Sequence, residues 1–254
     1  MKDGKKIVAT IEARMTSTRL PGKVLLPLAG EPCLTRLIER LKRSAYVDHI
    51  VIATTTNSTD DVLEELSMKL GVGVWRGSED NVLERVLDAA KSVQADLIVE
   101  VTGDCPLLDW RHVDHILELF SSGEYDYVAN NMERTFPRGF DLQVFPVKVL
   151  DEVNQVTQEP VDQENVSIYI YQHPEKYRLL NWAAEGFMRR PDIRVTLDTP
   201  QDYELIDTIF KKLLPVNPDF SAEDVVHLLE RESALLEINR DIKQKNPYGG
   251  VLEQ

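Results

Sequence analysis

Residues 12–23 read Glu-Ala-Arg-Met-Thr-Ser-Thr-Arg-Leu-Pro-Gly-Lys, and they follow the apolar run Ile-Val-Ala-Thr-Ile at 7–11. A short β-type run therefore ends in a loop that holds three cations, Arg14, Arg19 and Lys23. Cations this close repel one another unless an anion lies among them, and a triphosphate suits forked arginine donors and a mobile lysine. Backbone N–H groups of such a loop add further donors. A solvated basic loop after the first strand is the alternative interpretation of the same pattern.

Two common nucleotide-binding patterns do not occur in the chain, neither G-x-x-x-x-G-K-S/T nor G-x-G-x-x-G. The stretch resembles instead the first loop of the cytidylyltransferases that activate acidic sugars, which reads Ala-Arg-x-x-Ser-x-Arg-Leu-Pro-Gly-Lys. That family includes the acylneuraminate and 3-deoxy-manno-octulosonate cytidylyltransferases and a related spore-coat polysaccharide biosynthesis branch. The matching positions are Ala13, Arg14, Ser17, Arg19, Leu20, Pro21, Gly22 and Lys23.

The composition indicates a globular protein, with 43% hydrophobic and 28% charged residues among 254. The formal charge is 29 − 43 = −14, which disfavours a nucleic-acid partner. No apolar run approaches the roughly 20 residues that span a bilayer, and the run at 7–11 is too short for a secretory signal. Cys33 and Cys105 show no metal-type spacing. We therefore expect a cytoplasmic protein with reduced thiols and no membrane contact.

The first half of the chain alternates strand-like and helix-like stretches, which predicts βαβ units and a mostly parallel sheet. Ligands of such sheets bind beyond the carboxyl ends of the strands. Strands are expected at 7–11, 49–54, 72–75 and 96–102, the last of them central, and helices at 32–41, 59–70, 81–90 and 110–120.

The pattern changes after residue 120. Strands are expected at 125–129 and 140–145 without a full helix between them, then a helix at 162–172, strands at 177–182 and 193–197, and a helix at 200–212. We expect one domain over 1–254, with an inserted lobe at about 130–185 and a helical C-terminal tail at about 220–254 that breaks near Ser233. The resemblance implies an α/β fold of the nucleotide-diphospho-sugar transferase type. This is a Rossmann-like three-layer sandwich in which the inserted lobe serves acceptor binding and dimerisation.

Two aspartates are candidate metal ligands. Asp104 follows the expected strand at 96–102 in Gly-Asp-Cys-Pro-Leu, and Asp198 follows the one at 193–197 in Asp-Thr-Pro-Gln-Asp. Carboxylates with phosphate oxygens suit Mg²⁺. From the residues alone, Asp198 or Thr199 can cap the following helix, with Pro200 at the first helical position, and a cap is favoured over a metal role for Asp198. The resemblance reverses that order, because the family places metal-binding aspartates in both motifs. Cys105 is expected to be a small buried residue rather than a nucleophile.

The resemblance also extends to the nucleoside and acceptor sites. The loop Arg76-Gly77-Ser78 matches a family stretch that approaches the base, although Ser78 or Asp80 can equally cap the next helix. The acceptor candidates lie in two motifs of the expected lobe, where the chain departs from the family at four positions. Arg138 replaces Asp, Gln143 replaces Glu, Gln163 replaces Arg and Asn165 replaces His, whereas Gly139, Asp141 and Glu164 are kept. Unexceptional polar surface is the alternative for Arg138 and Gln163.

The resemblance implies a Mg²⁺-dependent transferase that moves CMP from CTP to an acidic 3-deoxy-2-keto sugar for surface glycan biosynthesis and forms a homodimer. Arg14, Lys23, Asp104 and Asp198 are then catalytic, and the last two hold the metal. The nucleotide is bound by Ala13, Arg14, Arg19, Lys23, Arg76, Gly77 and Ser78. The acceptor is bound by Arg138, Asp141, Gln143, Glu164 and Asn165.

Several alternatives stay open at this stage. Another nucleotide or a phosphonate acceptor would preserve the same chemistry. A glycosyltransferase of related fold would hold its metal through Asp-x-Asp, for which Asp60-Asp61 is the pattern to check. A non-catalytic nucleotide-binding or scaffold protein is disfavoured by the intact Lys23, Asp104 and Asp198.

Overall fold

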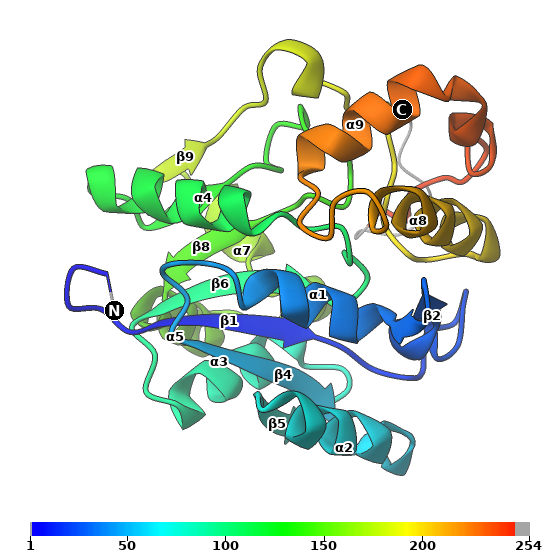
Figure 1. Ribbon diagram of the computed structural model, residues 1–254. Coiled ribbons are helices and arrows are strands. Elements are labelled where there is room, and N and C mark those ends of the chain that lie inside the picture. The colour runs from blue at the N-terminus through cyan, green and yellow to red at the C-terminus, as the bar shows by residue number, and fades with distance from the viewer. Residues whose placement is uncertain (1, 247–254) are drawn as a thin grey trace.

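A sheet of seven strands, in the order β5-β4-β1-β6-β8-β7-β9, organises the computed structural model, which describes residues 2–246 (Figure 1). Its strands are β1 (Ile7–Glu12), β4 (His49–Thr55), β5 (Gly73–Gly77), β6 (Leu97–Thr102), β7 (Tyr127–Ala129), β8 (Gln143–Pro146) and β9 (Leu179–Asn181). Within this sheet β8 alone runs antiparallel to its neighbours. The expected mostly parallel sheet with a central β6 is thus confirmed. A separate two-stranded hairpin pairs β2 (Pro27–Leu28) with β3 (Glu31–Pro32).

Helices cover both faces of the sheet, because the strands present apolar side chains to each face. One face packs against α1 (Cys33–Leu41), α2 (Asp61–Leu70) and α4 (Trp110–Ser122). The other packs against α3 (Val82–Ser92), α5 (Val147–Val156) and α7 (Ile168–Gln172). Figure 1 shows α1 and α4 on one side of β1 and β6, with α3 and α5 on the other. The three-layer α/β sandwich is therefore confirmed.

A second apolar cluster lies beside the sheet at the carboxyl ends of β1 and β6. It joins α8 (Pro200–Leu213) and α9 (Ala222–Arg231) to the first hairpin and to the segment 193–197. The short helices are η1 (Lys23–Leu25), η2 (Ser58–Asp60), α6 (Pro160–Glu164), η3 (Gly186–Met188) and η4 (Ser233–Glu237). The expected break near Ser233 is confirmed, since α9 ends at Arg231. The tail expected beyond residue 246 lies outside the described residues. No described helix is long and apolar enough to cross a membrane.

Two expectations about the second half of the chain are wrong, and one helix had no expectation at all. The helix expected at 162–172 is broken into α6 and α7, because Val166 takes a left-handed φ of 49°. The strand expected at 193–197 is extended but joins no sheet, and it pairs only at an isolated bridge between Arg138 and Arg194. The helix α5 was not anticipated, although its apolar face packs on the sheet.

The segment 193–197 binds two loops instead of a strand edge. Its Val195 N–H donates to Arg138 O over 2.7 Å, and its Leu197 N–H donates to Asp104 O over 2.8 Å. The first contact requires Gly139, whose φ is 110° and whose missing Cβ would lie 2.7 Å from the backbone of Val195. The second contact brings residue 198 next to residue 104, so two segments distant in sequence meet at the end of β6.

Candidate active site

The loop after β1 is held in place by acidic residues from two other loops. Arg14 Nη1 lies 3.1 Å from Glu79 Oε1, and Thr16 Oγ1 donates to the same oxygen over 2.7 Å. The Met15 N–H donates to Asp60 Oδ1 over 2.8 Å. Gly22 closes the loop with a left-handed φ of 71° and an N–H bond to Met15 O. These bonds fix the backbone and leave Lys23 facing the end of β6.

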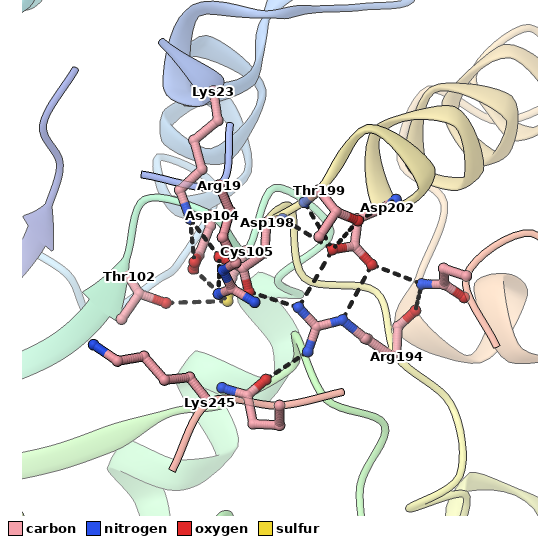
Figure 2. A network of polar contacts seen from close by, with 12 residues as sticks. Arg19, Lys23, Thr102, Asp104, Cys105, Arg194, Asp198, Thr199, Asp202 and Lys245 are labelled. Atoms are coloured by element: carbon pink, nitrogen blue, oxygen red, sulfur yellow. Dashed lines mark hydrogen bonds and ion pairs between the residues drawn. The ribbon is translucent and has the colours of Figure 1, made fainter. Parts of the chain in front are cut away.

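The chemical centre of the site is a cluster of cations around two aspartates (Figure 2). Lys23 Nζ lies 2.8 Å from Asp104 Oδ2 and 2.7 Å from Asp198 Oδ1. Arg19 Nη2 is 2.9 Å from Asp198 Oδ1, and Arg194 Nη2 is 2.6 Å from Asp198 Oδ2. The structure therefore joins Arg19, Lys23, Asp104 and Asp198, which the sequence placed in three separate motifs.

Asp198 is not the cap of the following helix. That position belongs to Thr199, whose hydroxyl accepts from the Asp202 N–H in a capping box. Asp202 accepts in return from the backbone N–H groups of Asp198 and Thr199, and it also pairs with Arg194. Thr199 and Asp202 make the hydrogen bonds at the N-terminus of the helix. The side chain of Asp198 is not needed there, and it faces Lys23.

The ionisation of this cluster is fixed by its internal pairs. Burial of Asp198 favours its neutral form, but Lys23, Arg19 and Arg194 outweigh burial and lower its pKa to about 2. Burial likewise opposes the charge of Lys23, yet the two aspartates raise its pKa above the usual value. Lys23 and Asp198 are therefore both charged at neutral pH, in contact, and only 14% and 9% exposed at their side chains.

Two adjoining cavities open beside the cluster. We call the first the central pocket; its volume is about 400 Å³. It is lined by Glu12, Ala13, Arg14, Ser17, Thr18, Arg19, Lys23, Val24, Val82, Arg85, Thr102, Gly103, Asp104, Glu164, Asn165, Asp198, Gln244 and Lys245. We call the second the side pocket; its volume is about 300 Å³. It is lined by Glu12, Glu100, Thr102, Asn131, Met132, Gln143, Glu164, Asn165, Ser167 and Tyr171.

The two aspartates fit a hard divalent cation, because oxygens from both converge on one point, where Lys23 Nζ now lies. Among residues 2–246 no group of three or more His, Cys, Asp or Glu could form a metal cage. Phosphate oxygens and water would therefore have to complete the coordination. Magnesium commonly accepts such a shared shell, since it keeps several waters and binds through one or two carboxylates.

The acidic pair Asp60-Asp61 has a structural role. Asp60 is fully buried and accepts from the hydroxyls of Thr54 and Thr55. Asp61 pairs with Arg76 over 2.7 Å, and this arginine also reaches Glu64. The glycosyltransferase alternative consequently gains no Asp-x-Asp metal site here.

The loop 76–78 lines neither of these two pockets. Ser78 Oγ accepts from the Asn81 N–H, and Asn81 rather than Ser78 or Asp80 caps α3. Arg85, a residue that the sequence analysis missed, bonds the Ser78 carbonyl and lines the central pocket. The sequence signal was an arginine three residues after Val82, on the apolar side of an amphipathic helix, where it is 3% exposed.

The acceptor candidates are divided between different places. Gln143, Glu164 and Asn165 line the side pocket. Asp141 instead forms a two-pronged ion pair with Arg134. The guanidinium of Arg138 has no hydrogen bond or ion pair among the described residues, and it is partly buried. Burial and the neighbouring Arg134 lower the Arg138 pKa, and Arg194 and Asp141 also lie close enough to act on it.

Two further carboxyl groups were missed, Glu12 and Glu100. Glu100 is 4% exposed in the middle of β6, and it contacts Glu12 at the end of β1. Burial raises the pKa of Glu100 well above its usual value, and the adjacent Glu12 raises it further; burial also raises the pKa of Glu12. A glutamate inside the apolar run Leu-Ile-Val-Glu-Val was a visible signal for a functional position.

A family model described as cytidylyltransferase matches residues 8–242. The spore coat polysaccharide biosynthesis protein SpsF of Bacillus subtilis is 38% identical over 232 residues, which cover 89% of this chain and 94% of that protein. A solved cytidylyltransferase from Leptospira borgpetersenii is 32% identical with a TM-score of 0.87, over 95% of this chain and 100% of that chain.

A more distant solved structure shows the same fold. It is a CMP:2-keto-3-deoxy-manno-octonic acid synthetase in complex with CTP, 19% identical with a TM-score of 0.63, over 82% of this chain and 100% of that one.

Proposed function

Because this chain belongs to the cytidylyltransferase family, we propose that it transfers CMP from CTP to a hydroxyl of an acidic 3-deoxy-2-keto sugar, with Mg²⁺ as the metal and pyrophosphate as the second product. The observation that carries the proposal is the cluster of Lys23, Asp104 and Asp198 at the end of β6. It lies in a pocket that also presents Arg14 and Arg19. The relative named for spore coat polysaccharide biosynthesis supports a substrate destined for a surface glycan.

The proposed step joins the acceptor oxygen to the α-phosphorus. The bond from that phosphorus to the bridging β-phosphate oxygen breaks, pyrophosphate leaves with the electron pair, and the hydroxyl proton passes to solvent. Such transfers depend mainly on positioning and on stabilising charge. Lys23 and Arg19 line the central pocket. They would position the triphosphate and stabilise its charge by binding phosphate oxygens in place of their present aspartate partners.

Asp104 and Asp198 would hold the divalent ion, which when bound neutralises negative charge on the reacting phosphates. Asp198 stays ionised at any physiological pH because its pKa is about 2. The capping box of Thr199 and Asp202 keeps the backbone around Asp198 in one position. These residues thus preserve a charged, oriented carboxylate at the point where the phosphates would lie.

Arg138 is the proposed contact for the acceptor's carboxylate. It is close to Cys105 and Arg194, which contact Asp104 and Asp198 respectively. Burial and Arg134 lower its pKa more than the nearby Asp141 raises it, so a further negative charge would stabilise the guanidinium. A carboxylate would supply that charge in a two-pronged geometry.

Pyrophosphate release with each of the four nucleoside triphosphates, with and without Mg²⁺, tests the proposal. The acceptor panel should contain neutral sugars, 3-deoxy-2-keto sugar acids and phosphonates. We expect release only with CTP, a divalent ion and an acidic acceptor. The proposal would be contradicted if GTP, UTP or ATP supported release and CTP did not, or if neutral sugars supported release and acidic sugars did not.

A further inference from the structure

The side pocket carries an unusual charge for a site that adjoins a triphosphate pocket. Its lining includes three acidic residues, Glu12, Glu100 and Glu164, and no lysine, arginine or histidine. It shares Glu12, Thr102, Glu164 and Asn165 with the central pocket, so a group bound in it lies next to the phosphates. Glu164 has an ion pair with Lys245 at 3.5 Å, so Glu12 and Glu100 are the acidic groups that a bare carboxylate placed there would face.

Glu100 is the most constrained of these groups. It is 4% exposed, and its Oε2 has no hydrogen-bond donor among the described residues. Its nearest charged neighbour is another carboxyl, that of Glu12, and none of the groups that act on it is a cation. Burial of two acids in contact is costly unless a donor or a positive charge satisfies them.

The hydroxyl closest to Glu100 is shared, because Ser167 acts on the Glu100 carboxyl and also bonds Gln143. Ser167 Oγ and Tyr127 OH both donate to the amide oxygen of Gln143. The side-chain amide of Asn165 donates to Val161 O over 2.7 Å. The break between α6 and α7 positions Ser167 for this bond, so the arrangement follows from the fold itself. The pocket is left rich in oxygens that accept and poor in groups that donate.

We propose that the acceptor presents an amino group to Glu100 and Glu12, and that it is a sugar acid in which an ammonium replaces one hydroxyl. This inference rests on the proposed function and names the substrate class of the same site. An ammonium has three donors and one positive charge, which match Glu100, because its buried Oε2 has no partner among the described residues and no cation acts on it. The carboxylate of the same acceptor would lie outside this pocket, at Arg138. The ammonium end of the acceptor then faces glutamates, and the carboxylate end faces an arginine.

The experiment compares matched acceptors. Its probes are 3-deoxy-manno-octulosonate, derivatives with one hydroxyl at a time replaced by an amino group, and the N-acetyl form of each derivative. Pyrophosphate release from CTP gives kcat/KM for each. We expect one amino derivative to exceed the hydroxyl acid by about 10- to 100-fold, the range for hydrogen bonds to a charged group. N-acetylation removes the charge and should abolish that preference.

Glu100→Gln separates recognition from folding, because it keeps the size of a buried side chain and removes its acid. We expect the amino preference to fall below about threefold while KM for CTP is unchanged, since the charged partner is lost. Glu204→Gln, an exposed glutamate on α8, is the matched control and should keep the preference. Equal use of hydroxyl and amino acceptors, or a preference that survives Glu100→Gln, would overturn the inference and leave the transferase function intact.

If no acceptor releases pyrophosphate from CTP, the proposed function fails instead. Calorimetry with the same hydroxyl and amino acids, on the wild type and Glu100→Gln, then decides the inference by itself. Tighter binding of an amino acid that Glu100→Gln abolishes supports it, and equal binding of both probes refutes it.

Discussion

The central and side pockets share a wall and treat charge in opposite ways. In the central pocket, the carboxylates of Asp104 and Asp198 are matched by Lys23, Arg19 and Arg194. In the side pocket, Glu100 faces Glu12 and no cation acts on it, whereas Arg85 and Arg14 of the central pocket act on Glu12. A carboxyl group is consequently held ionised at Asp198 and pushed toward its neutral form at Glu100.

This contrast separates what the family has in common from what this chain adds. The central pocket contains the motifs that resemble the family without change, from Arg14 to Lys23 and at Asp104. The side pocket contains two of the departures, Gln143 and Asn165, and it shares only Asn165 with the central pocket. The balanced charges of the central pocket suit the nucleotide, which the whole family shares. The unbalanced charge of the side pocket suits one particular acceptor.

The largest effect is expected for Asp104→Asn, which removes a charge from the central pocket. Turnover should fall by more than about 10²-fold, the scale for losing one preorganised electrostatic group, with little change in the fold. Steady-state kinetics and circular dichroism measure the two quantities. The exposed Asp192→Asn is the control. Wild-type turnover in Asp104→Asn would remove this residue from the site.

A smaller effect is expected for Lys23→Ala, because other cations remain in the pocket. CTP binding should weaken by about 10- to 100-fold, as for one charged hydrogen-bonding group, and cytidine binding should change by less than about threefold. Calorimetry with both ligands measures this difference, with the exposed Lys211→Ala as control. Equal losses for CTP and cytidine would assign Lys23 to the fold.

The two pockets should also respond oppositely to pH. The raised pKa of Glu100 means that the folded state keeps a proton that the unfolded chain loses near its usual value of 4.5. Its stabilisation is therefore full below that pH and is lost as the pH rises through the folded-state pKa. The slope is at most about 1.4 kcal/mol per pH unit for one proton.

Urea unfolding between pH 5 and pH 8 detects this slope, and Glu100→Gln should flatten it. Asp198 behaves in the reverse sense, because its pKa is lowered from 3.8 to about 2. Its contribution is present above pH 3.8 and is lost as the pH falls through about 2. An identical slope in Glu100→Gln and the wild type would show that this acid does not titrate as the structure indicates.

The smallest effect is expected for Arg76→Ala, outside both pockets. Arg76 pairs with Asp61 and Glu64 near the surface, and such pairs add little to stability. KM for CTP should change by less than about twofold. A large rise in KM in pyrophosphate-release assays would restore the role in base binding that the family resemblance implies for the loop 76–78.

The sequence predicted the parallel half of the fold well, because its strands are short apolar runs bounded by polar turns. Its motifs also singled out Lys23, Asp104 and Asp198, which lie in contact in the structure, while their catalytic and metal-binding roles stay predictions. It failed at 162–172 because a left-handed Val166 has no signal in the apolar pattern. It failed at 193–197 because apolar residues alone cannot tell a sheet strand from an extended segment held by loops.

Residues that act through tertiary contacts could not be found in the same way. Arg194 completes the cluster around Asp198 although no motif includes it. Gln244 and Lys245 reach the central pocket from a distant part of the chain. Glu12 and Glu100 become a pair only when β1 and β6 lie side by side in register. The homodimer, the magnesium ion and the cytoplasmic location stay predictions.

The balance of the cation cluster has a consequence for the speed of encounter. Lys23, Arg19 and Arg194 face Asp104, Asp198 and Asp202, so three positive charges meet three negative ones and the cluster exerts no long-range pull on an anion. The chain as a whole carries a formal charge of −14. A nucleoside triphosphate therefore approaches against repulsion and exchanges partners only on contact. Added salt should speed its association by screening that repulsion, the reverse of an electrostatically steered enzyme.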